Sequence, residues 1–148
     1  MRQWNNSAFK DSQSSNESSK SSRIYKDLDL YFTRKPSTSD VNTLKDVMAI
    51  KRSVRNLVLL NYYEKPFHPE IGSGIRDMLF EPLETITGVV LGRKVLEVLE
   101  DYEPRASVTS IDSIPDFERN AYSLKINFTI LNIPQEEQTV EVLLERLR

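Results

Sequence analysis

The chain has 148 residues, 39% of them hydrophobic, and its 20 basic and 22 acidic residues give a formal net charge of -2. This length and composition suit one domain with a modest core, and the charge balance gives no electrostatic reason to expect nucleic acid or an anionic membrane as a partner. Cysteine is absent from the sequence, which excludes disulfides, thiolate metal sites and a cysteine nucleophile.

The N-terminal segment is expected to form a disordered tail. Residues 12–22 read SQSSNESSKSS, without an apolar side chain, and such a segment buries too little surface to offset the entropy of ordering. Order is expected from about Ile24. The chain is therefore divided into a serine-rich tail, residues 1–22, and one domain, residues 23–148.

Two short extended segments are expected where the domain begins. In DLDLYF, residues 27–32, the side chains of Leu28, Leu30 and Phe32 alternate with those of Asp and Tyr, which is typical of a half-buried strand. A second extended segment can follow at residues 41–44.

Apolar periodicity predicts two main helices. The first has Asp46 as its N-cap and ends by Asn61. The second runs from Leu83 to about Tyr102, and its two glycines are expected to admit a neighbouring element. The apolar positions are Val47, Ile50, Val54, Leu57 and Val58 in the first helix, and Leu83, Ile86, Val90 and Leu96 to Leu99 in the second.

Between these helices, residues 62–82 are predicted to form a structured loop that plugs the core. Prolines and glycines punctuate it, and one or two helical turns can bury Ile75, Leu79 and Phe80. The single histidine, His68, is interpreted as structural, since neither a cysteine nor an acidic cluster accompanies it as a metal ligand.

The rest of the chain predicts a three-stranded antiparallel sheet. Its strands are expected at residues 107–114, 122–130 and 140–145. The links, residues 115–120 and 132–138, are short and rich in turn formers, which favours hairpins over crossovers. The expected fold class is α+β, with two main helices packed on a small antiparallel sheet that ends in a C-terminal β-hairpin.

The corner between the second helix and the sheet reads DYEPRASV, residues 101–108, and carries two opposite charges beside a proline. Pro104 must end the helix at about residue 102. If the chain is extended there, Glu103 and Arg105 point to the same side about 7 Å apart and can grip charges on a partner. The alternative, which the residues alone favour, is an ion pair within the chain.

Several punctuated segments follow one another in a definite order: KRSVRNLVLL, EKPFHPEIGSGIRDMLFEP, a helix, YEPRASV and a terminal strand pair. This order resembles the baseplate wedge and sheath-initiator family of contractile phage tails over about residues 46–148. The combination of FxPExGSGIRDxLFEP with EPR is fairly specific, whereas the three letters EPR alone would be worthless. The family also occurs in type VI secretion baseplates, and its members are sometimes labelled lysozyme-like.

The resemblance implies a structural role in the virion, at the tail baseplate, after assembly in the host cytoplasm. In the family, the motif that is here Glu103, Pro104 and Arg105 contacts a helical bundle of the larger wedge proteins. The terminal strands, here residues 121–133 and 139–147, offer the tail sheath a place to add strands. Tail tube or hub-proximal proteins are further candidate partners. No cofactor, metal, nucleic acid or membrane is expected, and no apolar run is long enough to span a bilayer.

Glycoside hydrolysis of the cell wall is the alternative function. It usually needs two carboxylates that face a sugar-sized cleft, one of them kept protonated by apolar surroundings. Glu81 and Glu84 are the nearest candidates, but they flank the start of a helix, where carboxylates are expected for electrostatic reasons. We therefore expect no enzymatic activity and assign no catalytic residue.

Overall fold

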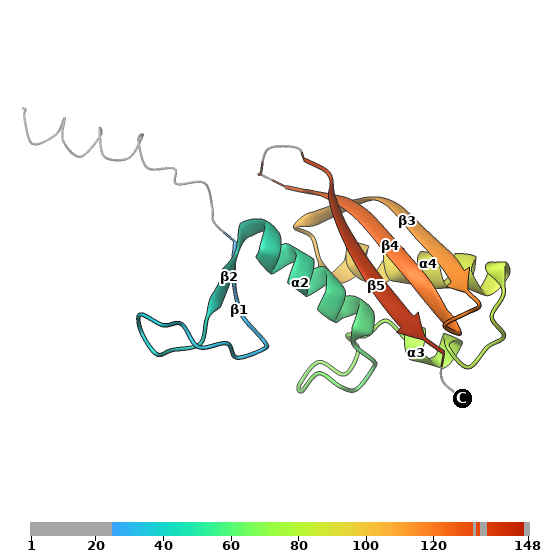
Figure 1. Cartoon of the computed structure of the whole chain (residues 1–148), viewed down its shortest axis with the longest axis horizontal. Helices are drawn as coiled ribbons and strands as arrows, with labels where there is room; N and C mark the ends of the chain where they lie inside the picture. The colour runs from blue at the N-terminus through green and yellow to red at the C-terminus, as the bar shows by residue number, and fades with distance from the viewer. Residues whose placement is uncertain (1–24, 132, 134–135, 147–148) are drawn as a thin grey trace, which may run out of the picture.

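The fold is α+β, as predicted, with two main helices packed beside a three-stranded sheet (Figure 1). The computed structural model describes residues 25–131, 133 and 136–146, so the predicted tail, residues 1–22, lies outside the described residues. The elements are β1 (Lys26–Leu28), β2 (Thr43–Lys45), α2 (Asp46–Leu59), α3 (Ile75–Met78), α4 (Thr85–Tyr102), β3 (Ala106–Asp116), β4 (Ala121–Ile130) and β5 (Gln138–Glu145).

The main sheet has the strand order β3-β4-β5 and is antiparallel throughout, so the predicted three-stranded meander is confirmed. Its central strand, β4, buries Tyr122, Leu124, Ile126 and Phe128, whose side chains alternate toward one face. α4 packs against β3 and α2 packs against β5 and α4 (Figure 1). The two helices and this face of the sheet enclose one core.

α2 buries the face that its sequence predicts and ends before Asn61, also as predicted. Its N-terminus differs from the prediction, because the helix begins at Asp46 itself and Lys45 occupies the capping position without a side-chain hydrogen bond. The Asp46 N–H instead donates to the carbonyl oxygen of Tyr25, at 2.7 Å. The helix residues in the core are Ile50, Val54 and Val58, with Val47 and Leu57 partly buried beside them.

The predicted half-buried strand at residues 27–32 is wrong beyond its first residues. The apolar side chains expected inside are exposed, namely Leu28, Leu30 and Phe32, whereas Asp29 is buried. The Asp29 carboxylate accepts hydrogen bonds from the Tyr31 N–H and the Thr33 hydroxyl. The backbone carbonyl oxygen of Asp29 accepts a further hydrogen bond from the Phe32 N–H. These local bonds turn the chain after β1, because an aspartate can satisfy backbone donors two residues on.

The first half of α4 packs through a different face from the one predicted, whereas Val98 and Leu99 in its second half are buried as predicted. It begins at Thr85, and Ile86 and Val90 are exposed. A Cβ atom on Gly88 would lie 3.1 Å from the carbonyl oxygen of Ser113 in β3, so the glycine side of the helix approaches the sheet, as expected of these glycines. The buried residues of α4 are Gly88, Leu91, Gly92, Val95, Val98 and Leu99.

The loop between α2 and α4 contributes to the core through the short helix α3. Ile75 and Leu79 are buried as predicted, but Phe80 is exposed. A Cβ atom on Gly72 would lie 2.4 Å from the backbone nitrogen of Tyr62, a separation that no side chain could tolerate. Glycine at this position therefore lets two segments of the loop backbone pass each other closely.

Candidate partner-binding sites

The corner after α4 is a tight turn. α4 ends at Tyr102, as Pro104 predicts. The Ala106 N–H donates a hydrogen bond of 3.1 Å to the carbonyl oxygen of Glu103, so Pro104 and Arg105 are the central residues of a β-turn. The extended passage considered from the sequence does not occur, and the turn brings the two charged side chains together.

Glu103 and Arg105 form an ion pair within the chain. Arg105 Nε lies 2.5 Å from Glu103 Oε1, and Arg105 Nη2 lies 2.6 Å from Glu103 Oε2, which is the two-point geometry that a guanidinium and a carboxylate favour. The Glu103 side chain is only 2% exposed, whereas that of Arg105 is 26% exposed. The carboxylate is therefore enclosed, and the guanidinium forms its cover.

The pair is tied to three other parts of the fold. Ser53 of α2 also hydrogen-bonds the Glu103 carboxylate. Arg105 Nη1 donates to Asp27 of β1 at 3.3 Å, and the Arg105 carbonyl oxygen accepts the Leu131 N–H at 2.9 Å, beyond the end of β4. The corner thus fastens α2, β1 and the sheet to the end of α4.

Electrostatics keep both members of the pair ionised. Burial alone would raise the pKa of Glu103, but the hydrogen bonds from Arg105 and Ser53 and the charge of Arg105 lower it below its ordinary value. The hydrogen bond to Glu103 raises the pKa of Arg105. The buried Glu103 carboxylate is thus ionised and hydrogen-bonded within the chain, which indicates that it stabilises the fold.

Part of the corner stays accessible to another molecule. Pro104 is exposed, and the three hydrogen bonds of Arg105 use three of the five N–H donors of its guanidinium. The sequence assigned Glu103, Pro104 and Arg105 jointly to a partner. Their geometry leaves Pro104 and the outer side of Arg105 for such a contact and turns the Glu103 carboxylate inward.

The second surface is the free edge of β5. Among the described residues, β5 pairs with β4 alone. The Arg146 N–H donates to the Asn120 carbonyl oxygen at 3.0 Å, so these two residues form a hydrogen-bonded pair. Hydrogen-bonded pairs alternate along an antiparallel ladder, so every second residue before Arg146 bonds to β4 and the residues between them point away from it. Arg55 Nη1 of α2 reaches the Glu141 carbonyl oxygen at 3.5 Å, which agrees with an outward carbonyl there. The residues whose backbone groups point to the free side are thus Thr139, Glu141, Leu143 and Glu145.

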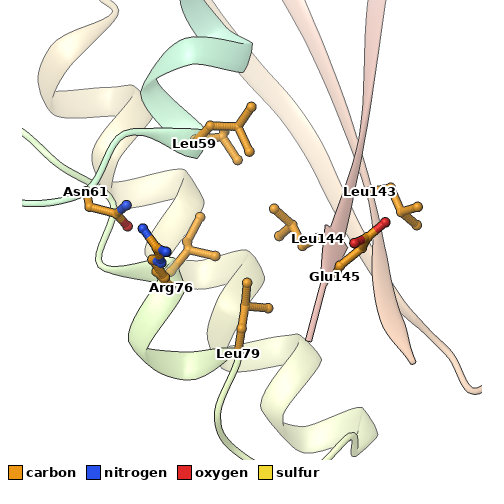
Figure 2. Close-up of a pocket in the computed structure, with 9 residues that line it drawn as sticks. Leu59, Asn61, Arg76, Leu79, Leu143, Leu144 and Glu145 are labelled. Atoms are coloured by element: carbon orange, nitrogen blue, oxygen red, sulfur yellow. The ribbon is translucent and has the colours of Figure 1, made fainter. Parts of the chain in front are cut away.

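A hollow with a mainly apolar lining lies between this edge and the helices. Figure 2 shows Leu144 of β5 directed toward Leu79, with Leu59 at the end of α2 across the space and Arg76 at the rim. Its volume is about 260 Å³. We call it the apolar hollow, and its apolar lining consists of Val58, Leu59, Ile75, Leu79, Leu143 and Leu144.

A second hollow lies further along the same edge. It has a volume of about 330 Å³ and lies between α2 and the start of β5. The Arg52 guanidinium carbon is 4.0 Å from the centroid of the Tyr31 ring, within cation–π distance. We call it the cationic hollow, and its lining consists of Tyr31, Met48, Lys51, Arg52, Arg55, Val140 and Glu141.

The residues considered for other chemistry are scattered over the surface. Glu81 and Glu84 are both exposed, unlike the acid of a glycosidase, which needs apolar surroundings. His68 is exposed beside Glu70, at 3.1 Å. In the part of the chain that the structure describes, no group of three or more His, Cys, Asp and Glu residues could hold a metal ion. Nor is any helix there long and apolar enough to cross a membrane.

Comparison with known proteins identifies the family. The family model described as baseplate wedge protein gp25 matches residues 45–135, from the start of α2 past the corner and β4. The chain belongs to this family. Baseplate wedge protein gp25 of Enterobacteria phage T4 is 24% identical over 120 residues, which cover 81% of this chain and 90% of that protein. The chain is thus a baseplate component of a contractile tail, as the sequence resemblance implied.

Two solved structures share the fold. A crystal structure described as a putative tail lysozyme from Geobacter sulfurreducens has a TM-score of 0.56 at 23% identity, over 65% of this chain and 88% of that chain. A chain in the cryo-EM structure of the anti-feeding prophage baseplate has a TM-score of 0.58 at 19% identity, over 81% of this chain and 86% of that one. At these identities the likeness concerns the fold alone.

Sequence reasoning missed the residues that complete both surfaces. Ser53 and Asp27, which hold the corner, lie about 50 and 80 positions away from it along the chain. Arg55, which reaches the β5 edge, has no role in the sequence-based prediction of the helix. Their local sequence carries no signal of these contacts, because only the packing of α2 and β1 brings them there.

Proposed function

We propose that this chain is a structural wedge subunit that joins the larger wedge proteins to the tail sheath and has no enzymatic activity of its own. The corner, through Pro104 and Arg105, docks on the helical bundle of the larger wedge proteins. The free edge of β5 accepts a strand of the tail sheath protein. Family membership and the geometry of these two surfaces support the proposal.

The free edge of β5 is the observation that carries this proposal. Backbone N–H and C=O groups at four alternate residues, from Thr139 to Glu145, face away from β4. An incoming strand can satisfy these groups with backbone hydrogen bonds and would take the place of Arg55 at the Glu141 carbonyl oxygen, and side-chain pockets beside the edge can fix its register. Sheath addition would thereby continue the sheet across two proteins.

The docking role of the corner rests on its rigidity and on the donors left on Arg105. The ion pair with Glu103 fixes the direction of the guanidinium before a partner arrives, so little side-chain entropy remains to be lost on binding. A carboxylate or a helix C-terminus on the wedge bundle fits the two remaining N–H donors.

The test is reconstitution of baseplates from the cognate wedge, tube and sheath proteins with variants of this chain. Leu143→Pro removes one outward N–H of β5, whereas Leu143→Ala changes the same side chain and keeps that donor. We expect baseplates with Leu143→Pro to assemble and to initiate sheath at least about tenfold less often than those with Leu143→Ala.

Arg105→Lys tests the corner in the same assay. It keeps a positive charge beside Glu103 but loses the planar fork, so we expect reduced incorporation into baseplates by a chain that still folds. Sheath initiation on Leu143→Pro baseplates at the level of Leu143→Ala would refute strand addition at this edge. Full incorporation of Arg105→Lys would show that the corner is not part of the docking surface.

A further inference from the structure

The free edge of β5 is flanked by two hollows of opposite chemical character. Leu144 reaches the apolar hollow at the C-terminal end of the strand, and Val140 reaches the cationic hollow near its N-terminal end. A strand that added to this edge would place its own side chains over both hollows. The edge therefore selects for side-chain chemistry as well as for an extended backbone.

In the described part of the chain, the cations of the second hollow form no ion pair, although Glu141 contributes to the lining. Among the residues that the structure describes, no acidic side chain forms an ion pair with Lys51, Arg52 or Arg55. Asp29, whose charge Arg52 senses, already accepts two hydrogen bonds of its own. Positive charge is thus concentrated at a place where an incoming strand would lie.

The spacing of the hollows sets the spacing of the side chains that fill them. Val140, Val142 and Leu144 face the helices, because alternate residues of a strand share one face. Val140 and Leu144 are four positions apart, which corresponds to roughly 13 Å along the strand. Residues on the facing side of an added strand repeat with the same period of two and meet the same two hollows.

We propose that the strand added to β5 carries a large apolar residue and an acidic residue four positions apart on its inward face. The apolar side chain enters the apolar hollow, and the carboxylate binds Lys51 and Arg55 in the cationic hollow. This inference rests on the proposed addition of a strand at the β5 edge and specifies what that strand must contain. Together the two hollows fix its register.

A second copy of this chain fits the edge poorly. If β5 paired antiparallel with its own copy, its inward residues would be Val140, Val142 and Leu144, none of which is acidic. The cations would then be covered by apolar side chains and lose hydration without gaining a partner, which is costly. The charge of the hollow therefore favours a strand of another protein.

The probes are ten-residue extended peptides of alternating threonine and valine in which leucine and glutamate lie four positions apart on the valine face. Both orders of the pair are made, because leucine before glutamate fits antiparallel addition and the reverse order fits parallel addition. Matched peptides carry lysine in place of glutamate. Binding to the full-length ¹⁵N-labelled chain is followed by NMR chemical-shift titration.

We expect a glutamate peptide to shift the amides of Thr139, Glu141, Leu143 and Glu145 and to bind about fivefold more tightly than its lysine counterpart. The double variant Lys51→Glu/Arg55→Glu should reverse this preference. Lys65→Glu/Arg93→Glu, which makes the same change in net charge at exposed positions elsewhere, should retain it.

Several outcomes would overturn the inference. They are equal binding of the glutamate and lysine peptides, an unchanged preference in Lys51→Glu/Arg55→Glu, no shift of the β5 amides at millimolar peptide, or the same shifts on concentrating the chain alone. Leu143→Pro separates this inference from the function it rests on. If that variant loses all peptides equally while the wild-type chain shows no charge preference, strand addition stands and the selection for an acidic residue fails.

Discussion

The corner and the β5 edge both lie at the surface, but the polar groups of the corner are bonded within the chain and those of the edge point away from it. At the corner, the Glu103 carboxylate is enclosed and engaged by Arg105 and Ser53. At the β5 edge, backbone groups of alternate residues are directed away from the sheet to which they belong. The carboxylate of the corner is bonded within the chain, whereas the outward groups of β5 make no bond to β4 and, apart from the Glu141 carbonyl oxygen that Arg55 reaches, are open to another strand.

This difference predicts that the corner stabilises the fold and that the β5 edge serves assembly with another protein. Substitutions at the corner should act on stability first, because they leave a buried charge without its partner. Substitutions at the edge should act on assembly first, because the groups they alter make no bond to β4. The variants below test this separation.

Arg105→Ala should have the largest effect. Removal of the guanidinium leaves Glu103 buried without its ion-pair partner, and we expect the free energy of unfolding to fall by roughly 3 kcal/mol. Urea unfolding monitored by circular dichroism measures this change. Arg119→Ala is the control, because its ion pair with Asp116 is exposed and 3.8 Å long and contributes little. Equal stability of the two variants would contradict the structural role of the corner.

The pH dependence of stability should show a smaller effect of the same pair. The pKa of Glu103 is lower in the folded chain than its ordinary value of 4.5, so its stabilising contribution is complete above that pH and is lost as the pH falls through the folded pKa.

Glu103→Gln removes this titration, so its free energy of unfolding should change less than that of the wild type between neutral pH and about pH 3. Urea unfolding of both proteins across this range provides the measurement. Parallel pH profiles would mean that Glu103 has the same pKa in the folded and unfolded chains.

The sequence predicted the parts of the fold that depend on local periodicity. The three strands, the buried face of α2 and the end of α4 before Pro104 follow from alternation, helical spacing and the geometry of proline. The same rules failed for the first half of α4, where Gly88 and Gly92 face the sheet and Ile86 and Val90 are exposed. A pattern of hydrophobic residues does not show how closely the helix backbone can approach the sheet at a glycine, which has no side chain.

The candidate sites were predictable only in part, for a related reason. Glu103, Pro104 and Arg105 were found from a short motif, but the direction of the Glu103 carboxylate depends on Ser53 and Asp27, which are distant in sequence. The free side of β5 was visible as a terminal strand. Its two hollows were not, because they form only where α2 and α3 pass the edge.

Leu143→Pro should have the smallest effect on stability. The Leu143 N–H points away from β4, so proline removes no ladder hydrogen bond, and we expect the free energy of unfolding to fall by no more than about 1 kcal/mol. Val142→Pro is the matched control one residue earlier, where the N–H bonds to Leu124 and its loss should destabilise the chain clearly more. Thermal unfolding of the two variants compares them directly. If Leu143→Pro proves as damaging as Val142→Pro, the N–H of Leu143 belongs to the ladder, and the edge would lack the free groups that an added strand needs.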